Sequence, residues 1–246
     1  MSYITEARMG VIFDVDGVLL DSYQMHFQCW LSLAEEDDIV ITESEFRSLF
    51  GRRGREIARQ VWGSEFSEEQ IVSIHRRKQA LYRESLQRNL PAMDGAVQLI
   101  DGLVEAGLVL AVGSSAPPAN VEMTLERLGR RQAFSAIVTG SDVTQGKPDP
   151  RVFLLAAQRM GLEPSHCAVI EDAPVGITAA VTGGMTAIAL LGTAPADRFT
   201  QAHLVVDSLR QLSPKRIADL IEDSLQQDLS TSSGRIAAEN LRNVRK

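Results

Sequence analysis

Two aspartates, separated by one residue, follow a short apolar segment near the start of the chain. Residues 9–13 read Met-Gly-Val-Ile-Phe, and Asp14, Val15, Asp16 and Gly17 come next. The apolar run predicts a buried strand, and carboxylates at the end of a buried strand are unfavourable unless a partner compensates their charge. Oxygen ligands of this kind suit a hard cation such as Mg²⁺. The alternative is an acidic turn without chemistry, because Asp and Gly are also common turn residues.

Three further polar clusters follow apolar runs or lie between them. Ser114 and Ser115 come after one apolar run, Glu171 and Asp172 come after another, and Lys147 lies within the sequence Gly-Lys-Pro-Asp-Pro. In an open parallel sheet, ligands bind outside the carboxyl ends of the strands, so we expect these side chains to converge with the first two aspartates. Each cluster also has a simpler interpretation: Ser114 and Asp172 as helix caps, and Lys147 as a solvated loop charge.

The remaining pattern predicts the elements that position these residues. Between residues 23 and 90 the sequence indicates helices only, and after residue 94 helices alternate with short apolar runs, which favours a parallel sheet covered on both faces. The expected helices of the first part cover 23–36, 43–50, 54–62 and 67–88; the expected later strands cover 108–112, 136–139, 167–170, 186–191 and 204–206. We therefore predict an α/β core (1–21 and 94–229), an inserted helical domain (22–93) and a flexible or helical tail (230–246).

Composition restricts the classes of function. The net charge of −7 over 246 residues argues against general affinity for nucleic acids, and it means that any phosphate site must be locally positive. No run of about 18 apolar residues is present, so no membrane span is expected, and the first nine residues do not resemble a secretory signal. Cys29 and Cys167 have no metal-site spacing, and we expect them to be core thiols of a reduced, cytoplasmic protein.

Taken together, the four clusters resemble the motifs of the haloacid dehalogenase superfamily of phosphatases and phosphomutases. The matching segments are Asp-Val-Asp-Gly-Val at 14–18, the serine after the second core strand, Gly-Lys-Pro-Asp-Pro at 146–150 and Glu-Asp-Ala-Pro-Val-Gly-Ile at 171–177. The resemblance implies a Rossmann-like parallel sheet with an inserted α-helical cap. It also implies four catalytic residues: Asp14 as the nucleophile, Asp16 as general acid and base, and Ser114 and Lys147 as groups that stabilise the phosphoryl group.

The same resemblance implies a magnesium site and a reaction course. Asp14, Asp16, Glu171 and Asp172 would hold Mg²⁺, with Asp16 contributing its main-chain carbonyl and Glu171 acting directly or through a bound water. Asp14 would attack phosphorus and form an aspartyl phosphate, a form of covalent catalysis. Asp16 would protonate the departing alkoxide and then deprotonate the next acceptor.

Residues of the helical insert resemble the β-phosphoglucomutase-like and CbbY-like branch of this superfamily. The shared features are the spacing of His26 and Trp30, the position of Arg55 after a glycine-containing turn, and Lys78 four residues before a tyrosine. This likeness implies that His26, Arg55 and Lys78, with Ser115 of the core, contact the substrate. A structural role for His26 and surface exposure of Arg55 and Lys78 are the open alternatives.

We therefore expect a Mg²⁺-dependent phosphatase of small phosphorylated metabolites such as sugar phosphates, acting as a monomer or weak homodimer. If a sugar hydroxyl replaces water as the acceptor, the enzyme is a β-phosphoglucomutase-like phosphomutase instead. A dehalogenase has no alkoxide to protonate, so Asp16 argues against that reaction. A non-catalytic phospho-switch, like the receiver domain of a response regulator, is the other alternative, but such domains have roughly half this length and lack the helical insert.

Overall fold

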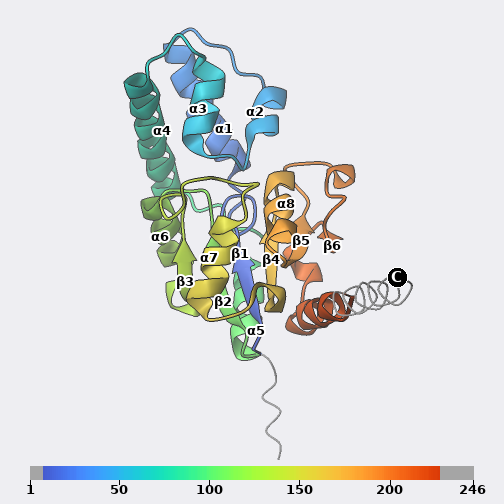
Figure 1. Ribbon diagram of the computed structural model, residues 1–246. Coiled ribbons are helices and arrows are strands. Elements are labelled where there is room, and N and C mark those ends of the chain that lie inside the picture. Colours follow the sequence, from blue (N-terminus) through green and yellow to red (C-terminus); the bar gives the residue numbers. More distant parts are fainter. Residues whose placement is uncertain (1–7, 228–246) are drawn as a thin grey trace, which may run out of the picture.

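The computed structural model describes residues 8–227, and a sheet of six parallel strands lies at its centre (Figure 1). The strands are β1 (Gly10–Phe13), β2 (Val109–Gly113), β3 (Phe134–Val138), β4 (Cys167–Glu171), β5 (Thr186–Leu190) and β6 (Leu204–Val206). Their spatial order is β3-β2-β1-β4-β5-β6, so β1 is central and the strand order reverses beside it. Open α/β sheets bind ligands at such a reversal, outside the carboxyl ends of the strands.

Helices cover both faces of the sheet, which confirms the predicted α/β architecture. Side chains alternate between faces along a strand, so Val11 and Phe13 pack with one helical layer and Ile12 packs with the other. The first layer contains α5 (Ala96–Glu105), α6 (Pro118–Arg127) and the helix over residues 214–227; the second contains α7 (Arg151–Met160) and α8 (Pro174–Thr182). The central strand is thereby buried from both sides.

Four helices are inserted between β1 and α5 and lie beyond the carboxyl edge of the sheet (Figure 1). They are α1 (Tyr23–Glu36), α2 (Glu43–Leu49), α3 (Gly54–Trp62) and α4 (Glu68–Arg88). These helices have a hydrophobic cluster of their own, which includes Trp30, Phe46 and Trp62. Thr42 and Ser67 begin α2 and α4 with capping boxes, in which the side chain and the main chain at the helix start satisfy each other's hydrogen bonds.

The two segments that join the inserted helices to the sheet lie side by side. The amide of Asp21 donates to the carbonyl of Pro91 at 2.8 Å, and the amide of Met93 donates to the carbonyl of Leu19 at 2.9 Å. The chain therefore leaves the sheet layers and returns to them at neighbouring points, as expected if a second connection follows the fourth helix.

Small differences from the predicted elements have local causes. β3 begins at Phe134, two residues earlier than expected, because Phe134 is buried while the exposed Ser135 interrupts the apolar pattern.

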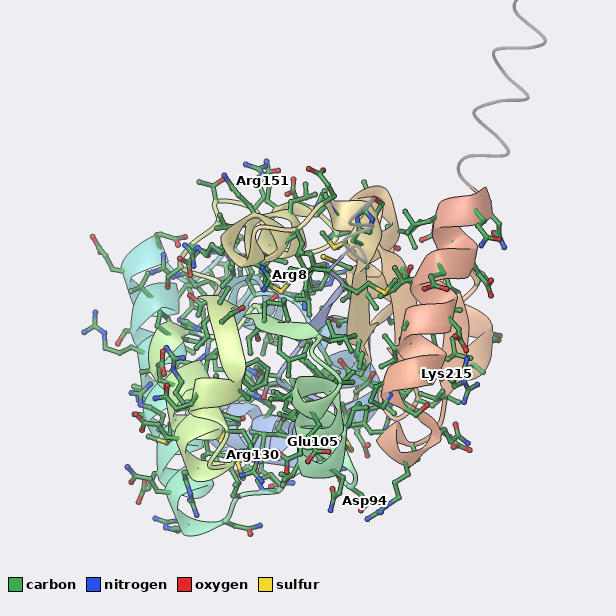
Figure 2. All side chains as sticks on the ribbon, turned by 90° about the horizontal axis from the view of Figure 1, so that it is seen from below. Arg8, Asp94, Glu105, Arg130, Arg151 and Lys215 are labelled. Carbon is green, nitrogen blue, oxygen red and sulfur yellow. The ribbon has the colours of Figure 1, made fainter. Side chains whose placement is uncertain are left out.

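Seen from below, the labelled Asp94 and Lys215 project at the rim of the molecule (Figure 2). Within residues 8–227, no helix combines the length and the apolar character needed to cross a membrane. The expected tail over 230–246 lies outside the described residues.

Candidate active site

Three strands deliver polar residues to one edge of the sheet. Phe13 of β1 aligns with Val112 of β2 and with Ile170 of β4, so the residues that follow these positions emerge together. They include Asp14 after β1, Ser114 after β2, and Glu171 with Asp172 at the end of β4. All four are buried. The shared strand register therefore brings together side chains that are separated by up to 158 positions in the sequence.

Lys147 lies between two of the buried carboxylates. Its Nζ atom is 3.1 Å from Oδ1 of Asp14 and 2.7 Å from Oε2 of Glu171. Burial by itself would lower the pKa of Lys147, but the two carboxylates outweigh that effect and raise its pKa above the ordinary value. The lysine is thus held as a cation beside Asp14.

The carboxylates of Asp14, Glu171 and Asp172 have the arrangement needed to bind a divalent cation. One oxygen from each lies within 4.8 Å of the others, and Lys147 offsets only part of their charge. Both carboxylate oxygens of Asp172 are buried and accept no hydrogen bond within residues 8–227, although buried polar atoms normally have partners. Gly17 leaves the space open, since a Cβ atom there would lie 1.9 Å from Oδ2 of Asp172.

Burial and mutual repulsion act on the charges of this cluster. Burial, together with the Asp14 charge, raises the pKa of Glu171 to about 7 although Lys147 opposes the shift. Burial and both neighbouring carboxylates also raise the pKa of Asp172 well above its ordinary value. A bound divalent cation would relieve this repulsion, so the residues present fit such an ion.

Asp16 does not join the carboxylate cluster but faces the inserted helices. Its Oδ1 atom accepts hydrogen bonds from Ser22 Oγ at 2.7 Å and Tyr82 Oη at 2.9 Å, and it lies 2.8 Å from Nε2 of His26. Burial opposes the charged form, but His26 and the other donors outweigh it and lower the pKa of Asp16. Ser22 precedes α1 as expected for an N-cap, yet its hydroxyl bonds to Asp16 and not to the helix.

His26 and Lys78 are buried and belong to the same network. The His26 ring stacks on Tyr82 with a centroid distance of 4.1 Å, and Lys78 Nζ contacts the Nδ1 atom of His26. Burial lowers the pKa of Lys78 to about 8, although Asp16 acts in the opposite direction. The structure therefore places Lys78 in the interior, where it links α4 through His26 to Asp16, and not on the surface.

A cavity of about 480 Å³ lies between the carboxyl edge of the sheet and the inserted helices. Its lining includes seven residues that the sequence analysis selected: Asp14, Asp16, His26, Arg55, Lys78, Ser114 and Ser115. Lys147, Glu171 and Asp172 are not part of the lining and lie in the cluster around Asp14. The cavity is thus bordered by the proposed nucleophile on one side and by basic groups on the other.

The three remaining candidates have different settings. Ser114 is buried, and its Oγ atom accepts a hydrogen bond from the Ala116 amide at 3.2 Å. Ser115 donates through Oγ to the carbonyl of Gly51 at 3.4 Å, so this core residue contacts the inserted helices. Arg55 is exposed and makes no hydrogen bond or ion pair within the described part of the chain, which leaves its guanidinium available at the cavity.

Arg53 is a residue of this region that sequence reasoning missed. Its guanidinium donates to the carbonyls of Gly140 and Thr144, each at 2.8 Å, and its side chain packs against Gly146, where a Cβ atom would lie 2.7 Å from it. Arg53 therefore connects the insert to the loop that leads to Lys147. The sequence Gly-Arg-Arg-Gly at 51–54 was a possible signal, but nothing in it distinguishes Arg53 from its neighbours.

The chain resembles known proteins over most of its length. Residues 11–190 match the family described as haloacid dehalogenase-like hydrolase. The β-phosphoglucomutase of Bacillus subtilis (strain 168) is 31% identical over 211 residues, covering 83% of this chain and 91% of that protein. Hexitol phosphatase A of Escherichia coli (strain K12) is 30% identical over 206 residues, covering 83% of this chain and 93% of its own length.

The fold agrees with these sequence similarities. A crystal structure of β-phosphoglucomutase from Clostridium difficile superposes with a TM-score of 0.82 at 26% identity, covering 89% of this chain and 99% of that one. The order of the motifs, the sheet topology and the buried acidic cluster beside a lysine are consistent with this match. The chain therefore belongs to the haloacid dehalogenase-like hydrolase family.

Proposed function

We propose that this protein is a Mg²⁺-dependent phosphatase of small phosphorylated metabolites, and of sugar phosphates in particular. The observation that carries the proposal is the position of Asp14, which is buried beside Lys147 and opens onto a cavity with basic walls. The similarity to hexitol phosphatase A supports a phosphoric monoester as the substrate.

Asp14 acts as the nucleophile in this proposal. Its carboxylate attacks phosphorus, an oxygen–phosphorus bond to Asp14 forms, and the bond from phosphorus to the substrate alkoxide breaks. Lys147 and the buried Ser114 stabilise charge on the phosphoryl oxygens. Mg²⁺, held by Asp14, Glu171, Asp172 and the carbonyl of Asp16, would supply the positive charge that lets two anions meet.

Asp16 moves the protons. It gives a proton to the departing alkoxide and then takes one from the water that hydrolyses the aspartyl phosphate. Its contacts with His26 and Ser22 lower its pKa, and Tyr82 also donates to its carboxylate. These contacts favour the charged form, which is the form needed to accept a proton. A phosphate dianion in the cavity acts in the opposite direction and raises the pKa of Asp16, because a nearby negative charge favours protonation.

In the same proposal, residues 22–93 form a cap over a core composed of 1–21 and 94–229. The separate hydrophobic cluster of the inserted helices and the adjacent connecting segments support this division. His26, Arg55, Lys78 and Ser115 contact the substrate under the closed cap, which excludes bulk water.

The proposal extends to the cellular setting. We place the protein in the cytoplasm as a monomer or weak homodimer that binds neither nucleic acid nor membrane. The net charge of −7 and two buried, unpaired cysteines support this setting.

Phosphomutase activity is the second candidate, and the similarity to two β-phosphoglucomutases favours it. In that reaction a sugar hydroxyl, and not water, accepts the phosphoryl group from Asp14. Incubation of a sugar 1-phosphate with a sugar bisphosphate distinguishes the two reactions. Isomerisation supports the mutase, whereas release of inorganic phosphate without isomerisation excludes it.

The test of the main proposal is turnover of an aryl phosphate in the presence of Mg²⁺. We expect phosphate release that stops with EDTA and in the variant Asp14→Asn, because both changes remove a component of the buried cluster. Asp197→Asn, a change at an exposed position, is the matched control and should retain full activity. Absence of Mg²⁺-dependent release from every phosphate ester tried would contradict the proposal.

A further inference from the structure

Four side chains form a hydrogen-bonded series that crosses from α4 to α6 beside the cavity. Arg83 Nη1 donates to Asn120 Oδ1 at 3.3 Å, Asn120 Nδ2 donates to Gln79 Oε1 at 2.7 Å, and Gln79 Nε2 lies 2.9 Å from His75 Nε2. Gln79 and Asn120 are only 8% and 3% exposed. His75, Gln79 and Asn120 line the cavity that Asp14 and Asp16 also border.

The direction of this series is fixed by its first member. A guanidinium has donors only, so Asn120 must present its carbonyl oxygen to Arg83 and its NH₂ group to Gln79. Gln79 must then accept through its oxygen and donate through its NH₂ group to His75. His75 Nε2 is therefore an acceptor, and the ring is neutral with its proton on Nδ1. Burial and the nearby cations of Lys78 and Arg55 lower the pKa of His75 to about 4, in agreement with a neutral ring.

Each amide in this series has a second N–H group, and His75 has Nδ1–H. Each amide oxygen already accepts one hydrogen bond, from Arg83 in the case of Asn120 and from Asn120 in the case of Gln79. Within residues 8–227, these N–H groups have no other hydrogen-bond partner. A neutral wall that presents N–H groups of this kind can donate to the lone pairs of hydroxyl oxygens, while the exposed Arg55 supplies the site for an anionic group.

We propose that Gln79 and Asn120 are specificity-determining residues that bind hydroxyl oxygens of a sugar or alditol leaving group. This inference rests on the phosphatase function proposed above and assigns substrate selection to residues that take no part in phosphoryl transfer. Gln79 belongs to the inserted helices and Asn120 to the sheet layers, so the wall is complete only when α4 packs against α6 as it does here. A site whose buried donors need partners discriminates against a substrate that lacks the matching oxygens.

The test compares a hexitol phosphate with an aryl phosphate, whose leaving group carries no comparable hydroxyls. Asn120→Asp keeps the shape and the contact with Arg83, but it places an oxygen opposite Gln79 Oε1 and so reverses the amide of Gln79. We expect kcat/KM for the hexitol phosphate to fall about 10- to 100-fold, with kcat/KM for the aryl phosphate changed less than about threefold. Gln79→Glu should act in the same direction. The control is Asn89→Asp, which makes the same chemical change at the exposed C-cap residue of α4.

A second measurement reports on the hydrogen-bond direction itself. In ¹⁵N NMR spectra, the wild-type His75 should show a protonated Nδ1, and Asn120→Asp should move the proton to Nε2. The inference is overturned if both variants leave the ratio of the two kcat/KM values unchanged, whether or not activity is lost. It is also overturned if His75 of the wild type is protonated on Nε2. If the wild-type protein hydrolyses neither substrate, the proposed function itself fails.

Discussion

Removal of the Asp172 charge should stabilise the protein when no metal is bound. Two unit charges at most 4.8 Å apart repel each other by at least about 3.5 kcal/mol at an effective dielectric constant of about 20, and Asp172 faces both Asp14 and Glu171. Attraction to Lys147 and proton uptake by these carboxylates reduce the effect. We therefore expect Asp172→Asn to raise the free energy of unfolding by about 1–3 kcal/mol in EDTA, because the amide keeps the volume and can donate to a carboxylate.

The same change should abolish the effect of Mg²⁺ on stability. A ligand at 100 times its dissociation constant stabilises the folded state by about 2.7 kcal/mol, and each kcal/mol corresponds to about 2–4 °C in Tm for a chain of this size. Thermal unfolding of both proteins in EDTA and in Mg²⁺ tests this. Asp197→Asn removes the same charge from an exposed position and controls for net charge.

Two results would refute the reasoning. If Asp172→Asn is less stable than the wild type in EDTA, the Asp172 carboxylate is stabilised in the folded protein by contacts other than a metal ion. If Mg²⁺ raises the Tm of the variant as much as that of the wild type, Asp172 is not a ligand.

Three further predictions concern the cavity and its closure. Asp16→Asn should lose most turnover but keep its Mg²⁺ affinity by calorimetry, because only the main-chain carbonyl is assigned to the metal; weaker binding would contradict that assignment. Burial lowers the pKa of Lys78 from 10.5 to about 8, so the folded state binds fewer protons than the unfolded state between these values. The stability of the wild type relative to Lys78→Met, from denaturant unfolding, should rise from near pH 8 to near pH 10, and a constant difference would argue against this shift. Arg53→Ala removes donors to the carbonyls of Gly140 and Thr144. Small-angle scattering should therefore detect a larger radius of gyration, and KM should rise several-fold. An unchanged radius of gyration and an unchanged KM would show that Arg53 has no role in closure.

The family, the α/β fold and the phosphatase reaction could be predicted because they depend on short motifs next to strong local patterns. The apolar run before Asp14 and the one before Glu171 each identify a buried strand, and parallel strands align their carboxyl ends. The convergence of Asp14, Ser114 and Glu171 follows from that rule alone. The roles assigned to these side chains, and the identity of the metal, remain predictions for the experiments above.

The residues that could not be predicted are those whose partners are distant in the sequence. Gln79 and Asn120 are 41 positions apart and meet only because α4 packs on α6. Arg53 is next to a glycine and close to Arg55, and no local pattern indicates which arginine reaches the core. Ser22 has the position of an N-cap, but Asp16 competes for its hydroxyl. In each case tertiary packing decides among options that the local sequence leaves equal.

The neighbouring connections between Leu19 and Met93 have a consequence for modularity. The segment that leaves the sheet layers and the segment that returns to them are joined by hydrogen bonds. A replacement segment therefore needs to span only the distance of a tight turn. A different helical module, or a short linker, could occupy this place without changing the register of β1 with β2 and β4. The inserted helices, and the substrate contacts that they supply, can therefore be exchanged while the strands that position Asp14 and Glu171 keep their alignment.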